Sequence, residues 1–296
     1  MQYYIGVAIL ICCNIIAVLG LSLLTGFTGI FSFGHAAYMA LGAYTAAIIT
    51  VQAGLPFAVG ILAAIVVAAI IGYLIGIPTL KLVGDYFAIV MIGVGEATKL
   101  ILDNLTDFTG GARGMGGIQQ HTSFLVAFVI MIGTVIFVRN IIRSRYGRCF
   151  MAIREDNLAA ECCGVDTFKM KKISLTISAG LGGLAGALYA HYITYIQPIM
   201  FNADKSTELA SAVVFGGIGS ISGSIIATVI LTGLPEILRP LYEWRLVLYG
   251  LLLVATIVLR PQGLMGGKEI TIAGIKNFFK NLKGKKFALK SRKEGN

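Results

Sequence analysis

A series of apolar runs, several of them long enough to cross a lipid bilayer, dominates this sequence. Hydrophobic residues make up 57% of its 296 residues and charged residues only 13%, whereas soluble domains carry about 25% charged residues. A bilayer-spanning helix needs about 20 consecutive apolar residues, and residues 4–24 supply them. The alternating segments of an outer-membrane barrel are absent from the sequence. The sequence therefore predicts an all-α protein, a polytopic transmembrane helical bundle.

We expect about eight to ten membrane crossings, some of them broken or re-entrant. The predicted helices cover residues 4–24, 35–51, 56–77, 86–102, 122–142, 173–192, 207–220, 221–238 and 244–260. The first has no basic segment before it and no small-residue cleavage site, so we predict an uncleaved span rather than a signal peptide. Nine crossings would put the N-terminus outside. A membrane-buried turn at residues 25–34 would add a crossing and put it inside.

Glycine-rich stretches interrupt the apolar runs at residues 25–34 (the first break) and at residues 214–223 (the second break). Irregular backbone at membrane depth is tolerated only where protein buries it or where it lines a wet cavity. Gly182 and Gly186 lie four residues apart within a predicted span, which is the spacing at which helices approach each other closely. We therefore expect tight helix packing around Gly182 and a special environment at each break.

The net charge of +10 is concentrated in two segments beside apolar runs. Residues 139–172 carry eight Lys or Arg against four Asp or Glu, and residues 260–296 carry ten against two. Basic residues that flank membrane spans face the cytoplasm. We therefore predict that residues 143–172 (the central loop) and the C-terminal tail are cytoplasmic, and that the polar stretches 103–121 and 197–204 lie outside.

This pattern divides the chain into a transmembrane domain, residues 1–262, and a basic cytoplasmic tail, residues 263–296. The tail is amphipathic at best and is predicted to lie on the membrane surface or to be disordered. Lysines next to a final span usually meet anionic lipid headgroups. We expect membrane lipid as the partner of the tail, and no nucleic acid.

The motifs of a self-contained catalyst are missing. Residues 262–269 come nearest to a phosphate-binding loop, but they lack the first glycine and the final Ser or Thr of G-x-x-x-x-G-K-[ST]. Neither G-x-S-x-G nor H-E-x-x-H occurs. The three histidines are far apart in sequence, and the five cysteines form no C-x-x-C pair. We expect no catalytic residue, no metal site and no cofactor bound by this chain, which is therefore not predicted to be an enzyme.

The central loop contains the pattern of a short helix. Asp156 or Asn157 is placed to cap its start, and Gly164 is placed to end it. Small residues would line one face of this helix, and such a face fits into a groove on another protein. The alternative is a solvated helix that only connects two spans.

Three stretches, in this order along the chain, carry a family resemblance. They are GFTGIFSFGHAAYMALGAYTAAI at residues 26–48, AIREDNLAAECCGVDTFKMKKISLTISAGLGGLAGALYAHYITYIQP at residues 152–198, and RPQGL at residues 260–264. Together they resemble the permease subunits of bacterial branched-chain amino acid ABC transporters, of the LivM type. The resemblance covers most of residues 15–265.

The resemblance implies an assembly of several chains in a bacterial inner membrane. It implies a second, LivH-like permease, two cytoplasmic ABC ATPases that use ATP and Mg²⁺, and an extracytoplasmic amino-acid-binding protein. It implies leucine, isoleucine and valine as substrates, and a coupling loop of the form E-A-A-x-x-x-G that docks on an ATPase. In this sequence Leu158 stands at the place of the Glu. The coupling residues are then Arg154, Glu155, Asp156, Ala159, Ala160, Glu161 and Gly164, and which acidic residue makes the polar contact stays open.

We predict a translocation pathway that is lined by Thr28, Ser32, His35, Tyr44, Glu96 and Lys99. The charged ends of an amino acid need fixed donors and acceptors, which freed backbone and hydroxyl groups supply. The alternative is that the hydroxyl groups satisfy only the local backbone. Glu96 and Lys99 lie three residues apart on one helix face, so they either line the pathway or form an ion pair that holds helices together.

Two other functions stay open. A self-contained secondary transporter or channel would need inverted repeats with matched broken helices, and the two breaks hint at this without aligning in sequence. An importer of urea or short amides would share the architecture of the branched-chain amino acid permeases.

Overall fold

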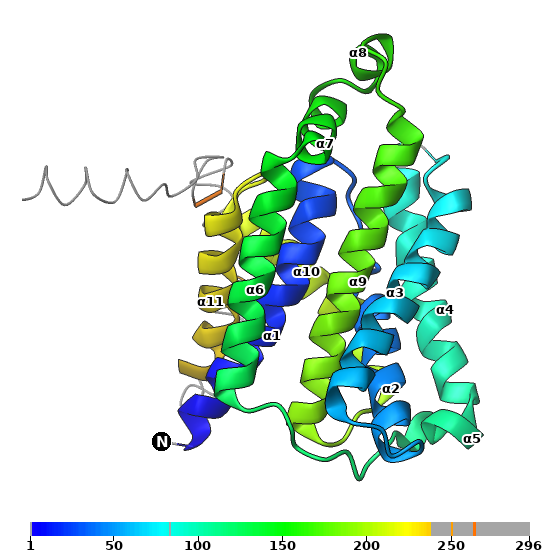
Figure 1. Cartoon of the computed structure of the whole chain (residues 1–296), viewed down its shortest axis with the longest axis vertical. Coiled ribbons are helices and arrows are strands. Elements are labelled where there is room, and N and C mark those ends of the chain that lie inside the picture. Colours follow the sequence, from blue (N-terminus) through cyan, green and yellow to red (C-terminus); the bar gives the residue numbers. More distant parts are fainter. Residues whose placement is uncertain (1, 83, 238–249, 251–262, 265–296) are drawn as a thin grey trace, which may run out of the picture.

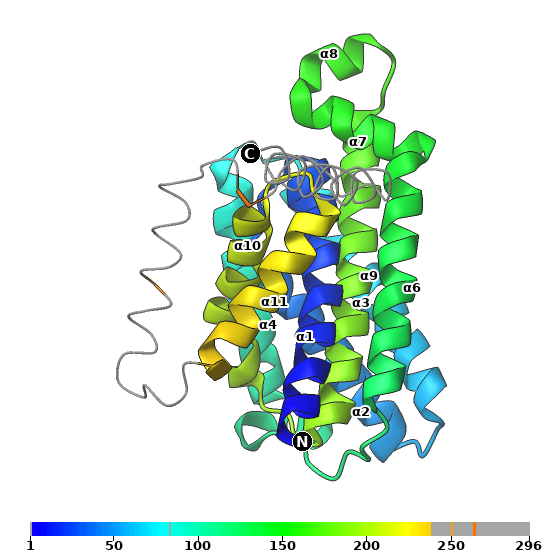
Figure 2. The same ribbon diagram turned by 90° about the vertical axis from the view of Figure 1, so that its left-hand side faces the viewer.

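The structure is a computed structural model that describes residues 2–82, 84–237, 250, 263 and 264. Its longer helices run side by side as a bundle (Figures 1 and 2). They are α1 (Gln2–Leu21), α2 (His35–Val51), α3 (Phe57–Thr79), α4 (Asp85–Asn104), α6 (Phe124–Arg143), α9 (Thr167–Ile193), α10 (Ala203–Gly216) and α11 (Ile221–Ile237). The shorter elements are the π-helix η1 (Ser22–Phe27), α5 (Thr106–Thr109), the 3₁₀ helices η2 (Gly111–Arg113) and η3 (Pro198–Phe201), α7 (Arg145–Glu155) and α8 (Asn157–Cys162).

The predicted all-α, polytopic fold is confirmed. The described residues contain no β-strand, only one isolated antiparallel bridge between Met115 and Ile196. Four helices are long and apolar enough to cross a membrane, and α2 and α11 are shorter apolar helices. These four are Tyr3–Phe27, Phe57–Thr79, Phe124–Arg143 and Thr167–Ile193. The predicted span 244–260 and nearly all of the basic tail lie outside the described residues.

Several predicted helix boundaries are wrong, and the helix expected at residues 207–220 is α10 at Ala203–Gly216. The third helix was expected to end at residue 77, but α3 continues through Pro78 to Thr79, because a proline in the last turn removes only one intrahelical hydrogen bond. The helix expected at residues 173–192 begins instead at Thr167, where the Asp166 side chain accepts a hydrogen bond from the Lys169 backbone N–H at 2.9 Å. The last turns of the predicted central loop therefore belong to α9.

The two ends of the bundle carry different segments. Helix α8 projects at one end, while the start of α1 and helix α5 lie at the other (Figure 1). The N-terminal end of α1 and the central loop are therefore at opposite ends of the bundle, as an odd number of crossings between them requires, while the count of nine stays a prediction. The polar stretch 103–121 meets the residue just before the stretch 197–204 at one end of the bundle. Met115 N–H pairs with Ile196 C=O at 2.8 Å, and Ile196 N–H pairs with Met115 C=O at 3.0 Å.

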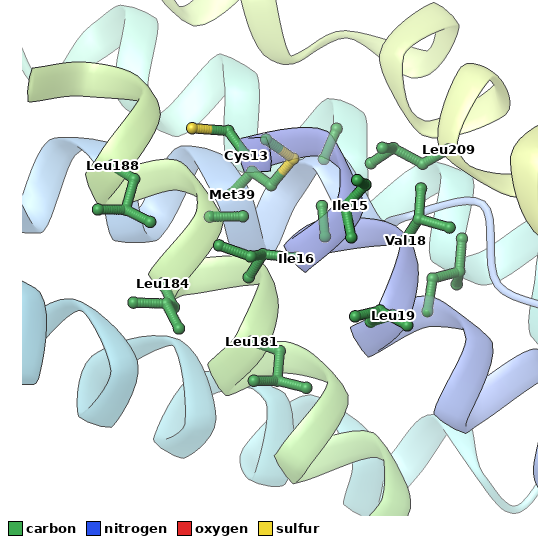
Figure 3. Close-up of a cluster of buried hydrophobic side chains, with 14 of the residues drawn as sticks. Cys13, Ile15, Ile16, Val18, Leu19, Met39, Leu181, Leu184, Leu188 and Leu209 are labelled. Carbon is green, nitrogen blue, oxygen red and sulfur yellow. The ribbon is translucent and has the colours of Figure 1, made fainter. Parts of the chain in front are cut away.

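Helix α9 lies at the centre of the bundle and packs closely against α1, α2 and α3. Figure 3 shows Leu181, Leu184 and Leu188 of α9 beside the buried apolar side chains of α1. A Cβ atom built on Gly186 would lie 1.9 Å from the Met39 carbonyl oxygen of α2, so a side chain cannot fit there. The close helix packing predicted from the glycine spacing is present.

Candidate functional site

The first break is a real interruption of helical structure. Helix α1 ends in the wider π-helical turn η1, and residues 28–34 then run without helix to the start of α2. A Cβ atom on Gly34 would lie 2.3 Å from the Met91 carbonyl oxygen of α4, so only glycine fits at this point. The break is thus held against α4 by backbone contact.

Hydroxyl groups donate hydrogen bonds to backbone carbonyl groups at the end of α1 and in η1, where the first break begins. Thr28 Oγ1 donates to the Leu23 carbonyl at 3.0 Å and lies 2.7 Å from Ser174 Oγ of α9. Ser178 Oγ donates to the Gly20 carbonyl at 2.7 Å. Buried backbone groups without such partners cost free energy comparable to a lost hydrogen bond.

A serine from another helix also bonds the start of α2. Ser206 Oγ of α10 accepts a hydrogen bond from the Ala36 backbone N–H at 3.0 Å. The residue at the N-cap position of α2 is Gly34, which has no side chain, so Ser206 caps the helix in its place. Ser174, Ser178 and Ser206 were not among the predicted site residues. Ser178 could have been found as a hydroxyl within a mainly apolar run, whereas Ser206 stands in a polar stretch and gave no such signal.

The four predicted pathway residues from the break and α2 lie in the interior of this chain. Thr28, Ser32, His35 and Tyr44 are each at most 2% exposed. Neither ring nitrogen of His35 has a hydrogen-bond partner among the described residues, and the same is true of the Tyr38 hydroxyl beside it. Their place in the pathway stays a prediction.

The other two predicted pathway residues lie on the surface of α4. Lys99 Nζ and Glu96 Oε2 are 3.5 Å apart, so the expected ion pair forms, and the side chains are 24% and 42% exposed. Large apolar residues on the same helix, including Ile92 and Leu100, are also exposed. A Cβ atom on Gly93 would meet nothing within 4 Å. This face of α4 is open in the isolated chain and carries charge among apolar residues.

The central loop forms the short helix that was predicted. Asp156 Oδ1 accepts hydrogen bonds from the Leu158 and Ala159 backbone N–H groups at 2.8 and 3.0 Å, and Gly164 has a φ of 81° after the helix. Asp156 is therefore the cap, and the left-handed conformation explains the glycine. Helix α8 projects beyond the ends of the membrane helices (Figures 1 and 2).

The acidic residues of the central loop have partners within the chain. Glu155 pairs with Arg154 at 2.7 Å, and Asp156 caps α8. Glu161 Oε1 accepts hydrogen bonds from Asn157 Nδ2 at 3.2 Å and from the Thr167 hydroxyl. The three carboxylates thus stabilise the loop, whatever else they contact.

The tip of α8 presents an apolar surface. Leu158 is 72% exposed, and Ala159 and Cys162 are exposed beside it. Ala160 is only 4% exposed and faces inward. The side chain of Arg154 does not point to this surface either, because its Nη1 donates to the Gly26 carbonyl of the first break at 2.9 Å. Sequence reasoning treated Leu158 only as a departure from a motif.

The described residues include no group of three or more His, Cys, Asp or Glu side chains placed to hold a metal ion. The rings of His121 and His191 approach to 6.2 Å despite their distance in sequence. His191 is bonded to the Ala187 carbonyl and the Thr50 hydroxyl at 2.9 and 3.1 Å, so its ring has a structural role.

Comparison with known proteins decides the family. Residues 3–257 match the model of a family described as branched-chain amino acid transport system / permease component. The chain belongs to this family. The resemblance to LivM-type permeases is therefore confirmed, and with it a multi-pass membrane protein.

Individual relatives agree with the family match. The LivM permease of the high-affinity branched-chain amino acid transport system of Escherichia coli K12 is 31% identical over 88% of this chain and 69% of its own length. The LivH permease of the same organism is 26% identical over 85% and 91%. A probable LivM permease of Methanocaldococcus jannaschii is 23% identical over 75% and 73%. No solved structure matches the chain.

Proposed function

We propose that this chain is the membrane-spanning permease subunit of an ATP-driven importer of leucine, isoleucine and valine. The observation that carries the proposal is the projecting α8 with its exposed Leu158, in a chain that belongs to a permease family. The chain itself has no phosphate-binding motif. ATP and Mg²⁺ are bound by two ABC ATPase subunits, and this chain is not an enzyme and binds no cofactor.

Helix α8 is the docking element for one ATPase. The contact is mainly apolar, because Leu158 is the exposed residue at the position of the motif Glu, while Asp156 and Glu161 are already hydrogen-bonded within the loop. Burial of an apolar side chain in a groove stabilises a complex without a charged partner. The excess of Lys and Arg around α8 supports a cytoplasmic position for this helix, in a protein of the inner membrane of a bacterial cell.

The open face of α4 contacts a second, LivH-like permease subunit. A charged pair such as Glu96 with Lys99 is expensive against lipid and faces protein or a wet cavity. The seam between the two permeases is the translocation pathway. The first break lies on the other side of α4, where Gly34 packs against the carbonyl oxygen of the buried Met91, so α4 separates the break from this seam.

Substrate passes in three steps that use different ends of the bundle. An extracytoplasmic binding protein delivers the amino acid to the end that holds residues 103–121 and 194–202. Closure of the ATPases moves α7 and α8, and this motion tilts the helices at the first break. Thr28, Ser32, His35 and Tyr44 then become accessible to the substrate, because a break is where a helix bends at least cost.

The proposal is tested with the complete complex in lipid nanodiscs. ATP hydrolysis is measured with binding protein that carries L-leucine, L-isoleucine, L-valine, urea or acetamide. The proposal expects stimulation by the three amino acids and none by urea or acetamide. Stimulation by urea or acetamide alone would replace the substrate assignment with the amide alternative.

A further inference from the structure

Arg154 joins the central loop to both breaks in the membrane helices. It is the next-to-last residue of α7 and stands two residues before the Asp156 cap of α8. Its Nη1 donates to the Gly26 carbonyl at 2.9 Å and its Nη2 pairs with Glu155 at 2.7 Å. The side chain is 30% exposed, so it reaches away from solvent into the bundle.

Three glycines from the two breaks surround this side chain. A Cβ atom on Gly29 would lie 2.9 Å from Arg154 Cγ, and one on Gly219 would lie 2.4 Å from Arg154 Nη1. The Gly26 carbonyl completes the site. A Cβ atom on Gly26 would lie 3.1 Å from the Gly219 backbone nitrogen, so the two breaks also pack closely against each other. A side chain at either Gly29 or Gly219 would displace the arginine.

The chemistry of the site suits a guanidinium group. The Gly26 carbonyl belongs to the last turn of η1, where carbonyl groups have no intrahelical partner and the helix dipole is negative. A charge-assisted hydrogen bond to such a carbonyl is stronger than a neutral one. The planar, forked guanidinium reaches the carbonyl and Glu155 at once, which the single ammonium of lysine cannot do in the same geometry.

We propose that Arg154 is a positioning residue that transmits motion of the ATPase-docking helix to the first and second breaks. Motion of α8 pulls on η1 through the hydrogen bond from Arg154 to the Gly26 carbonyl, and it displaces the turn between α10 and α11 because the guanidinium packs against Gly219. This inference rests on the proposed function. It separates two roles within one loop: Leu158 binds the ATPase, and Arg154 passes the motion on.

The test is the ratio of leucine taken up to ATP hydrolysed by the complete complex in proteoliposomes. Arg154→Gln is expected to lower this ratio, because the link between α7 and the first break loses its charge-assisted hydrogen bond, while ATP hydrolysis continues. Arg148→Gln removes the same charge from an exposed position on α7 and is expected to keep the wild-type ratio. Arg154→Lys, which retains the charge, is expected to fall between Arg154→Gln and wild type.

A second perturbation reaches the site from the other side. Gly219→Ala places a methyl group against Nη1 and is expected to lower the ratio as Arg154→Gln does. Gly84→Ala is the matched control, because Gly84 also has a positive φ of 65° but has no atom within 4 Å of the added Cβ. Faster deuterium uptake by residues 26–34 in Arg154→Gln, without it in Arg148→Gln, is the accompanying structural result.

The outcomes distinguish the inference from the proposed function. If wild-type complex takes up leucine with ATP and Arg154→Gln keeps the wild-type ratio, the transmitting role of Arg154 is wrong and the proposed function stands. A fall in uptake and hydrolysis together, at constant ratio, would show that Arg154 only stabilises the loop, and this also overturns the inference. If the wild-type complex shows no ATP-dependent leucine uptake, the proposed function itself is wrong.

Discussion

Replacing Leu158 by alanine is expected to weaken binding of the ATPase subunit. Leu158 is 72% exposed in the isolated chain, and complete burial of a leucine side chain stabilises by about 1.5–3 kcal/mol. Docking can therefore gain about 1–2 kcal/mol from the exposed part of this residue, most of which alanine would lose. That loss corresponds to an affinity about 5- to 30-fold lower.

The assay is binding of the purified ATPase subunit to the permease complex in nanodiscs, measured by equilibrium titration. Leu105→Ala is the matched control, because Leu105 is 44% exposed at the end of α4 where α5 begins, away from α8. The thermal unfolding midpoint of Leu158→Ala should equal that of wild type, because an exposed substitution rarely changes stability by more than about 0.5 kcal/mol. Unchanged ATPase affinity in Leu158→Ala would refute docking through the apolar tip of α8.

Three further predictions concern the cap, the α4 face and the helix packing. Asp156→Ala should reduce ATPase stimulation, because loss of an N-cap destabilises a helix by about 1 kcal/mol. Asp156→Asn keeps the cap and should retain most of the stimulation. Equal loss of stimulation in both variants would assign the role of Asp156 to its charge. Glu96→Gln should lower leucine uptake in proteoliposomes because it leaves Lys99 without its ion-pair partner. The exchange of both residues, Glu96→Lys with Lys99→Glu, should restore part of the uptake. Full uptake by Glu96→Gln would contradict the role of the open face of α4. Gly186→Ala should lower the thermal midpoint in detergent, since overpacking costs about 1–3 kcal/mol, while Gly133→Ala, which meets nothing within 4 Å, should not.

Local signals in the sequence predicted the local structure well. The apolar run at residues 35–51 coincides with α2, the Asp156 cap and the Gly164 end of α8 are present, and the first break interrupts helical structure as expected. Each of these depends on residues within a few positions of one another. Cap and turn chemistry act at that range.

Contacts between distant segments could not be predicted in the same way. Arg154 bonds Gly26 across 128 residues of sequence, and Ser178 bonds Gly20 across 158. Nothing near Arg154 in the sequence distinguishes an arginine that faces an ATPase from one that faces a helix end. The early start of α9 was missed because the lysines near residues 169–172 appeared to belong to a loop, although Lys172 lies 4.6 Å from the centre of the Tyr73 ring and so has a partner in the bundle.

The measurement that tests the central claim most directly is uptake of radiolabelled L-leucine by two sets of proteoliposomes. One set holds this chain with its partner permease, the two ATPases and the binding protein, and the other holds this chain alone. The account predicts uptake that requires both the complete complex and ATP. Leucine uptake by this chain alone, without ATP, would contradict it and would identify a secondary transporter or channel.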